Sequence, residues 1–320
     1  MQFPSIEMSG AGELVLINPI SGGGHDAALS RRLREFAESK DAAIVFTTPE
    51  MDYTRLGLDA YHRIWICGGD GSVGNVINGI HRSASARIPL IGLVPVGTGN
   101  DFAHALGYSS LHPVPDPGDV FDTLLSDYVV VQMTDEQGGR FERAMINSAG
   151  IGLDAEVAAL AGRMRIFGRS SYFAATIARV LRRPHWSVTI ETDGGTATRQ
   201  AMLVGFGNSP RTGGGFLLTP EAEIDDGFVD ICTIDKVRVA RALILLPTVR
   251  SGRHIRFAEV TTDTARTVTV EVTPPAPIHV DGEVISLRAT RVEATVRAQC
   301  LPFCVPTRRY YASFKPSSFS

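Results

Sequence analysis

Three glycine-rich loops in the first third of the chain carry the residue types that bind phosphate. They span residues 18–24 (NPISGGG), 68–72 (GGDGS) and 97–101 (GTGND). Glycine lets a backbone approach a ligand closely and adopt positive φ, and loop amides at a helix N-terminus donate to phosphate oxygens. No G-K-[ST] sequence is present, so none of the loops is a Walker loop. The loops predict a polyphosphate site in a nucleotide-using enzyme.

The residues expected to contact the nucleotide are glycines, hydroxyls and amides of these loops and of a neighbouring strand end. They are Asn18, Ser21, Gly22, Thr48, Gly68, Gly69, Gly71, Ser72, Gly97, Thr98, Gly99 and Asn100. Asp70 allows two interpretations: it caps the helix that follows, or it is the partner of Mg²⁺ or of a substrate hydroxyl. Asp101 is expected to cap a short helix over residues 102–106.

Apolar runs precede the three loops, at residues 14–17, 64–67 and 90–96, and helix-like sequence follows each loop. This alternation predicts an α/β domain with a parallel, doubly wound, Rossmann-like sheet over residues 1–133. In such a sheet all three loops lie along one edge, at the carboxyl ends of the strands.

The pattern changes after residue 133. Alternating apolar residues separated by turn signals predict a mostly antiparallel, β-rich, sandwich-like domain over residues 134–307. Strand candidates cover residues 186–190, 202–206, 228–234, 268–272 and 292–296. Helical stretches are expected at 155–183 and 239–249, and residues 308–320 form a C-terminal tail.

Composition narrows the class of protein. The net charge of −3 gives no global reason to bind nucleic acid. Cys300 and Cys304 have no second pair, so two ligands are too few for a metal site. No signal peptide is visible and no apolar stretch reaches the ~18 residues that a membrane span needs. We therefore expect a cytoplasmic protein with reduced thiols.

The three loops in this order resemble the diacylglycerol kinase catalytic-domain family, which also contains sphingosine and ceramide kinases. Residues 12–300 share the resemblance. In the second half it rests on residues 147–155 (NSAGIGLDA), on 213–215 with Pro220, on 225–230 (DDGFVD) and on 280–283 (VDGE). The resemblance implies a lipid kinase that uses ATP and Mg²⁺.

The resemblance also implies residue roles. Asp281 would be the general base on the acceptor hydroxyl, supported by Glu283. Asp226 would hold a structural magnesium with the backbone carbonyls of Glu223 and Phe228. Asp70 would connect to the catalytic magnesium and the phosphates. From the residue pattern alone, Asp281-Gly282 between two apolar runs predicts a hairpin turn.

Two residues near these motifs, Asn75 and His279, need separate interpretation. Asn75 stands where bacterial members of the family commonly have a glutamate, so this chain has no carboxylate at that position for a metal or a hydrogen-bond network. His279 precedes Asp281 by two residues, and strand alternation places both side chains on one face. His279 is more readily interpreted as a core histidine than as a functional group.

We expect an interdomain cleft in which Asp281 accepts the proton of a lipid hydroxyl while loop amides and Mg²⁺ stabilise the transferred phosphoryl group. Diacylglycerol, giving phosphatidic acid, is the first-choice acceptor. Ceramide or a sphingoid base is second, and phosphatidylglycerol-like lipids are third. The alternatives are an NAD-kinase-like enzyme with a soluble substrate and a non-catalytic lipid-binding protein.

The lipid substrate requires access to a membrane surface. Residues 239–249 are strongly apolar and lie between Arg238 and the arginines 250, 253 and 256. This segment is expected either to pack against the β domain or to contact anionic headgroups. We expect a peripheral protein at the inner face of the membrane. The sequence allows a homodimer but does not define the oligomeric state.

Overall fold

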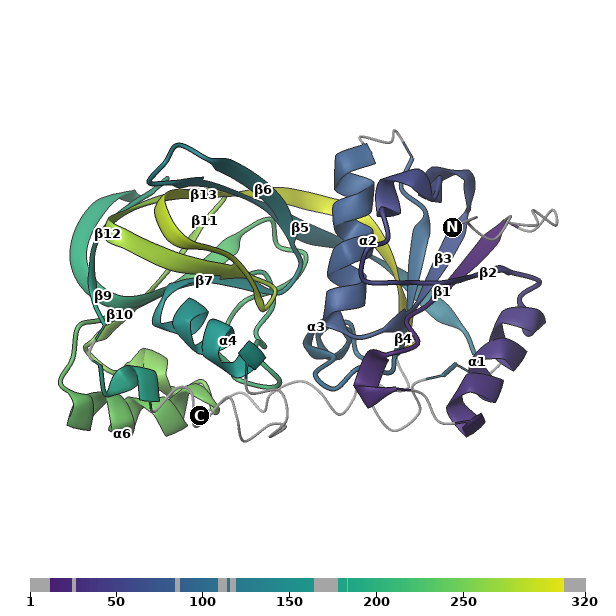
Figure 1. Ribbon diagram of the computed structural model, residues 1–320, viewed down its shortest axis with the longest axis horizontal. Coiled ribbons are helices and arrows are strands. Elements are labelled where there is room, and N and C mark those ends of the chain that lie inside the picture. The colour runs from purple at the N-terminus through teal and green to yellow at the C-terminus, as the bar shows by residue number, and fades with distance from the viewer. Residues whose placement is uncertain are drawn as a thin grey trace. The chain divides into compact units, whose positions relative to one another are not determined.

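A computed structural model describes residues 12–24, 27–83, 87–108, 114–115, 119–163, 178–182 and 184–307. The chain divides into two compact units (Figure 1). Unit 1 contains the residues up to Ser126 and those from Cys300 onward, and unit 2 contains Asp127–Gln299. Two strands, β5 (Phe121–Asp135) and β13 (Glu283–Pro306), run through the boundaries.

Unit 1 is built on strands that pair in parallel. They are β1 (Glu13–Ile17), β2 (Ala43–Phe46), β3 (Arg63–Gly68) and β4 (Leu90–Pro95). Their order is β2-β1-β3-β4, and Phe303 of β13 pairs in parallel with Ile91 of β4. The chain moves to opposite sides of β1 to place β2 and β3, which is how an open α/β sheet creates a ligand crevice.

Helices connect these strands and cover the sheet. They are α1 (Ala27–Ser39), α2 (Asp70–Ser83) and α3 (Asp101–Ala105). Leu33 and Phe36 of α1 pack in one core cluster with Val15 and Trp65. The alternate strand residues, such as Leu16, are buried as well. A strand buried on both faces reads as a continuous apolar run, which explains why the sequence predicted these elements.

Unit 2 is rich in antiparallel strands. They are β6 (Arg140–Met145), β7 (Ser148–Gly152), β8 (Trp186–Thr192), β9 (Gly195–Gly207), β10 (Val229–Asp235), β11 (Val260–Ala265) and β12 (Thr267–Val280). The main path is β11-β10-β9-β7-β12-β13, with β8 pairing β9 and β12. The α/β first domain and the β-rich second domain are both confirmed.

Alternating side chains build the core of unit 2. Val268, Val270 and Val272 of β12 are buried with Val188 and Phe206 in one cluster. The residues between them on β12 are more exposed. Period-two alternation therefore decides which face of each strand packs inward, and this is the pattern from which the sequence predicted strands.

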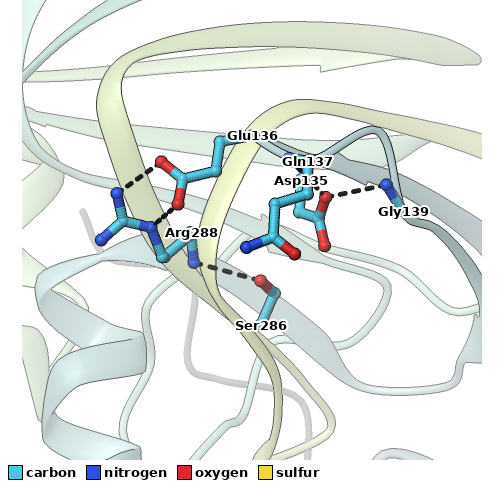
Figure 2. Close-up of polar contacts among 6 residues, drawn as sticks. All are labelled: Asp135, Glu136, Gln137, Gly139, Ser286 and Arg288. Carbon is cyan, nitrogen blue, oxygen red and sulfur yellow. Dashed lines mark hydrogen bonds and ion pairs between the residues drawn. The ribbon is translucent and has the colours of Figure 1, made fainter.

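The β5–β6 hairpin is closed by side chains of its turn (Figure 2). Asp135 Oδ1 accepts from the N–H groups of Gln137 and Gly139, at 2.9 and 2.8 Å. Glu136 forms an ion pair with Arg288 of β13. The Glu136 N–H also donates to the Arg288 carbonyl at 3.1 Å. These bonds fix the turn of the hairpin to β13 within unit 2.

Two helices of unit 2 matter for function. Helix α4 (Leu153–Arg163) follows β7, and α6 (Val239–Val249) follows β10. Of the helix expected over 155–183, residues 164–177 and 183 lie outside the described residues, as does the tail 308–320. Among the described helices, none has the length and apolar character needed to cross a bilayer.

The unit boundaries differ from those expected from the sequence. The first falls after Ser126, inside β5, instead of after residue 133. The second falls inside β13, whose last residues rejoin unit 1 by pairing with β4. A continuous strand carries no turn signal at a unit boundary, so composition alone does not reveal these positions.

Candidate active site

The glycine-rich loops of unit 1 contact one another backbone to backbone. A Cβ on Gly97 would lie 2.4 Å from the Gly69 Cα, and a Cβ on Gly22 would lie 2.5 Å from the Val96 carbonyl oxygen. Real side chains do not tolerate such distances, so glycine is required at Gly22 and Gly97. The loops that follow β1, β3 and β4 therefore meet at one edge, as the sequence predicted.

Asn100 holds the third loop in shape. Its backbone is left-handed, with φ of 55°. Its Oδ1 accepts from the Gly97 N–H at 3.0 Å, and its Nδ2 donates to the carbonyls of Pro95 and Gly97 at 3.0 and 2.8 Å. The buried Asn100 side chain is thus occupied by its own loop, which positions the backbone that a ligand would meet.

Asp70 joins the second loop to the third. Its two carboxylate oxygens accept from the backbone N–H groups of Asp101 and Phe102, each at 3.0 Å. Asp70 therefore caps α3. The expectation that Asp101 caps this helix is wrong, because Asp101 is already inside the first turn and the capping acceptor comes from another loop.

The first loop is tied to the second through Asn18. Asn18 Nδ2 donates to the Ser72 hydroxyl at 2.9 Å, and the Asn18 N–H donates to the Cys67 carbonyl at 2.9 Å. The end of β2 lies beside this loop, because the Thr47 N–H donates to the Ile17 carbonyl at 2.8 Å. The next residue, Thr48, is exposed.

Other loop positions lie at the surface. Thr98 and Gly71 are exposed, and a Cβ built on Gly71 meets no atom within 4 Å. Gly71 lies in the first turn of α2, where backbone N–H groups and the helix dipole favour an anion. The open surface of the loops thus lies at a helix N-terminus.

In unit 2, Asp281 lies in a hairpin turn and is held by backbone N–H groups. Asp281 and Gly282 have φ of 48° and 80°, and Val280 pairs with Glu283, so the predicted Asp-Gly turn is confirmed. The carboxylate accepts from Ile146, Asn147 and Ser148, at 3.0, 2.9 and 3.1 Å.

The environment of Asp281 sets its charge. Burial raises the pKa of Asp281 to about 6, while the three N–H groups and Arg143 act in the opposite direction. Arg143 forms an ion pair with Glu283 at 2.7 Å. Glu283 thus contacts the arginine whose charge acts on Asp281, and its supporting role stays a prediction.

His279 connects Asp281 to α4. The ring is buried, its Nε2 lies 2.8 Å from Asp154 Oδ2, and the Gly282 N–H donates to Nδ1 at 3.3 Å. Burial lowers the pKa of His279, but Asp154 and Asp281 outweigh it and leave the pKa raised. In the neutral ring, the Gly282 bond places the proton on Nε2, which donates to Asp154.

Gly150 makes room for this pair. A Cβ on Gly150 would lie 2.7 Å from Asp154 Oδ2 and 2.8 Å from His279 Nε2. The sequence assigned no role to Asp154 and little to His279. The available signal was a histidine two residues before Asp281 in an apolar strand, but its partner is 125 residues away in the chain.

Unit 2 contains an apolar pocket, and Asp154 is one of the residues that line it. Leu153, Met202, Leu203, Leu218, Leu245 and Val249 line it, and Asp154 and Thr212 supply polar side chains. The Thr212 hydroxyl lies 2.6 Å from the Ser148 hydroxyl, and the Ser148 N–H binds Asp281. Two short hydrogen-bonded paths, through His279 and through Ser148, thus join the polar residues of the pocket to the Asp281 turn.

The turn near Asp226 is rich in acidic residues. Asp226 Oδ1 accepts from the Phe228 N–H at 2.9 Å. Burial, followed by the charges of Asp226, Glu221 and Glu223, raises the pKa of Asp230 to about 7. Among the described residues, no three or more His, Cys, Asp or Glu side chains are arranged to hold a metal. The metal site that the resemblance implies, at Asp226 with the carbonyls of Glu223 and Phe228, stays a prediction.

Two family models together cover most of the chain. The diacylglycerol kinase catalytic domain matches residues 13–130. The YegS C-terminal NAD kinase beta sandwich-like domain matches residues 147–305. The first match contains the three loops, and the second contains Asp154, His279 and Asp281.

Curated relatives agree with these matches. The diacylglycerol kinase of Mycobacterium tuberculosis (strain ATCC 25618 / H37Rv) is 31% identical over 281 residues, covering 84% of this chain and 87% of the relative. The diacylglycerol kinase of Staphylococcus carnosus (strain TM300) is 27% identical over 225 residues, covering 70% of each. These matches define a lipid kinase, a phosphotransferase with an alcohol group as acceptor. The chain belongs to the diacylglycerol kinase family.

Solved structures share the fold. A diacylglycerol kinase from Bacillus anthracis str. Sterne aligns with a TM-score of 0.64 at 18% identity, covering 92% of this chain and 97% of that one. Yeast NADH kinase, solved with NADH, aligns with a TM-score of 0.53 at 10% identity, covering 98% and 90%. At these identities the likeness concerns the fold alone.

Proposed function

We propose that this lipid kinase transfers the γ-phosphoryl group of ATP to the hydroxyl of diacylglycerol and so produces phosphatidic acid. The observation that carries the proposal is the apolar pocket of unit 2, whose polar residues Asp154 and Thr212 are linked by hydrogen bonds to the Asp281 turn. An acyl chain suits the apolar lining, and a hydroxyl group suits the polar end.

Asp281 is the proposed general base. With a pKa of about 6 it is ionised at neutral pH and still basic enough to accept a proton. A carboxylate offers about four lone-pair sites, and three N–H groups use three of them. One site is left for the acceptor hydroxyl. Glu283 and Arg143 adjust the charge at Asp281 without contacting the hydroxyl.

Unit 1 is the proposed nucleotide-binding domain. Its close-packed glycines fix the loop backbones, and the N-terminus of α2 presents N–H groups where Gly71 is open. Ser21, Thr48, Thr98 and Gly99 complete the proposed contacts with ATP. Because the loops contain no lysine, backbone N–H groups supply most of the phosphate binding.

The proposed metal is Mg²⁺, which neutralises phosphate charge in phosphoryl transfer when bound. Carboxylate and carbonyl oxygens are its preferred ligands, so Asp226 with the carbonyls of Glu223 and Phe228 fits a structural ion. Burial is the main cause of the raised pKa of Asp230, but the negative charges of Asp226, Glu221 and Glu223 add to it, and a cation at this turn would offset them. Asp70, which joins the second loop to the third by capping α3, is the proposed contact to the catalytic ion.

Other lipids with a hydroxyl group could accept the phosphoryl group by the same reaction. Ceramide and sphingoid bases also combine an acyl or alkyl chain with a hydroxyl group. The fold likeness to NADH kinase keeps a dinucleotide acceptor as a second candidate. The predominantly apolar lining of the unit 2 pocket favours a lipid over a dinucleotide.

The test is phosphoryl transfer from radiolabelled ATP to a panel of acceptors in detergent micelles, resolved by thin-layer chromatography. The panel contains diacylglycerol, ceramide, sphingosine, phosphatidylglycerol and, in solution, NAD. We expect the strongest labelled product to be phosphatidic acid. Labelled ceramide or sphingosine as the main product would reassign the acceptor, and labelled NADP alone would overturn the lipid proposal.

A further inference from the structure

Helix α6 exposes an apolar stripe on one side. The stripe consists of Ala240, Leu243, Ile244 and Pro247, all of them exposed. Their spacing of three, four and seven residues places them on one face of the helix. Leu243 is 39% exposed and Ile244 is 56% exposed. The α6 stripe is thus a continuous apolar surface facing solvent.

The other side of α6 packs inward. Ala242 and Leu245 are buried, and they line the apolar pocket together with Leu246 and Val249. The sequence left burial and membrane contact as alternatives for this segment. The structure shows that the two faces of the helix differ. One face is buried and forms a wall of the pocket, and the other face is the exposed α6 stripe.

Positive charge flanks the stripe. Arg250 adopts a helical backbone and follows Pro247 by three residues, so it continues the α6 stripe. Arg253 and Arg256 lie in the next helical turn, and all three arginines are exposed. Helix α6 itself contains no acidic residue. The helix does contain Arg241, whose guanidinium is bound by Glu259 through two hydrogen bonds of 2.7 and 3.0 Å.

We propose that the α6 stripe and the arginines 250, 253 and 256 form the surface by which this protein docks on an anionic lipid bilayer. An amphipathic helix with basic flanks binds in the headgroup region, where apolar burial and charge attraction act together. The proposal rests on the proposed function, because the pocket on the other face of α6 is where the lipid would bind. Docking through the stripe would bring that pocket wall to the bilayer surface.

A second copy of this chain is the competing occupant of the same surface. Apolar residues at positions 243 and 244 could equally pack in a dimer. The basic flank favours the bilayer, because two copies of a surface with three exposed arginines repel one another, whereas anionic headgroups attract them.

The experiment is co-sedimentation of the full chain with vesicles of phosphatidylcholine containing phosphatidylglycerol, at low and high salt. One variant carries Leu243→Ser and Ile244→Ser, and a second carries Arg250→Gln, Arg253→Gln and Arg256→Gln. Leu287→Ser is the matched control, because Leu287 is 59% exposed elsewhere in unit 2. Each basic residue contributes ~1 kcal/mol, so the arginine variant should bind about a hundredfold more weakly.

We expect both variants to lose vesicle binding while Leu287→Ser binds like wild type, and we expect wild-type binding to weaken as salt rises. Equal binding by wild type and both variants would overturn the proposal. A dimer in solution that dissociates in the Leu243→Ser, Ile244→Ser variant would overturn it in favour of self-association.

Activity on micellar diacylglycerol separates this inference from the proposed function. None of the substituted residues lines the pocket or the Asp281 turn, so all variants should keep wild-type turnover on micelles. Normal vesicle binding by a wild-type protein that phosphorylates no lipid would contradict the proposed function and leave the docking surface intact. Normal lipid phosphorylation by a wild type that binds no vesicles would contradict the docking surface alone.

Discussion

The loops of unit 1 and the Asp281 turn of unit 2 are built in opposite ways. In unit 1, the side chains of Asp70 and Asn100 bind backbone groups and fix the shape of the loops. In unit 2, backbone N–H groups bind the Asp281 carboxylate and fix the position of one side chain. In the proposed function, the first arrangement prepares backbone donors for phosphate, and the second prepares an acceptor for a proton.

This difference determines which substitutions are informative. In unit 1 a change acts through backbone geometry, so an added Cβ is the sharpest probe. In unit 2 a change acts through the chemistry of one group, so an isosteric substitution is the sharpest probe. The comparison predicts that the two kinds of variant fail at different steps of the reaction.

The largest effect is expected for Asp281→Asn. Asparagine tolerates the left-handed backbone of this turn, but an amide does not accept the hydroxyl proton. We expect turnover to fall by ~10²–10⁴-fold, the range for a lost general base. The amide nitrogen would face the Ile146 N–H, so about 1–3 kcal/mol of stability should also be lost.

Asp193→Asn is the matched control, because Asp193 begins another Asp-Gly turn in unit 2, between β8 and β9. It should keep wild-type turnover. An Asp281→Asn protein that keeps more than half of the wild-type turnover would reduce Asp281 to a turn residue.

Gly97→Ala should act at nucleotide binding. Its Cβ would lie 2.4 Å from the Gly69 Cα and 2.7 Å from Asn100 Oδ1, and the backbone atom has no room to move. Strain of about 1–3 kcal/mol should weaken ATP binding roughly tenfold or more. Isothermal titration calorimetry measures this affinity directly.

Substitutions at two further glycines serve as comparisons for the effect of Gly97→Ala on ATP affinity. Gly71→Ala meets no protein atom within 4 Å, so any loss of ATP affinity there reports a clash with the ligand itself. Gly194→Ala, whose Cβ would lie 3.5 Å from the Thr192 hydroxyl in unit 2, should leave affinity unchanged. Normal ATP affinity in a folded Gly97→Ala protein would remove the third loop from the site.

Turnover should depend on pH through Asp281. Its pKa of about 6 lies above the ordinary value of 3.8, and the base works only when ionised. We expect turnover to rise through a midpoint near pH 6 and to reach about a tenth of its maximum one unit below the midpoint. The same shift means that the folded state favours protonated Asp281. The stability that the folded state gains from holding Asp281 protonated is therefore fully present below pH 3.8 and is lost as pH rises through about 6.

The comparison of wild type with Asp281→Asn isolates this group. Urea unfolding at pH 5 and pH 8 should show the variant gaining stability relative to wild type as pH rises. A pH profile without a midpoint between 5 and 7, or a stability difference that is the same at both pH values, would assign the base to another group.

His279→Ala should have a smaller effect on turnover, roughly tenfold, because it acts by positioning the Asp281-Gly282 turn. The change removes the acceptor of the Gly282 N–H and the partner of Asp154. His279→Gln should restore part of the loss, because the glutamine amide can donate to Asp154. A positioning role lowers kcat without raising the KM for ATP, and equal kcat values for wild type and His279→Ala would contradict it.

The smallest effect is expected for the stability of Asp70→Asn. One oxygen that accepts from α3 becomes a donor, which should cost about 1 kcal/mol, as for other lost helix caps. Asp52→Asn is the control, because Asp52 caps an exposed turn through the Thr54 N–H. Chemical denaturation measures both. Turnover that falls more than tenfold with so small a change in stability would support the proposed contact of Asp70 with the catalytic ion, and unchanged turnover would contradict it.

Local patterns of the sequence predicted the elements well. Buried parallel strands followed by glycine loops, and the Asp-Gly hairpin at Asp281, are encoded by consecutive residues. The α6 segment showed its apolar character, but only the structure separates Leu243 and Ile244 from the buried Ala242 and Leu245.

Long-range partners were not predictable in the same way. Asp70 caps a helix 31 residues further on, and His279 binds an aspartate 125 residues away. Neither pairing leaves a local signal, since each residue alone fits a turn or a core position. The assignment of the α3 cap to Asp101 failed for this reason: the nearest carboxylate in sequence was not the nearest in space.

The central claim is that ATP is bound by the loops of unit 1 while Asp281 of unit 2 acts only on the acceptor. The most direct test is calorimetric titration of ATP into Asp281→Asn, a variant expected to lose turnover. The account predicts an ATP affinity within about twofold of wild type, because Asp281 contributes nothing to nucleotide binding. An affinity reduced in proportion to turnover would contradict the separation of roles between the two units.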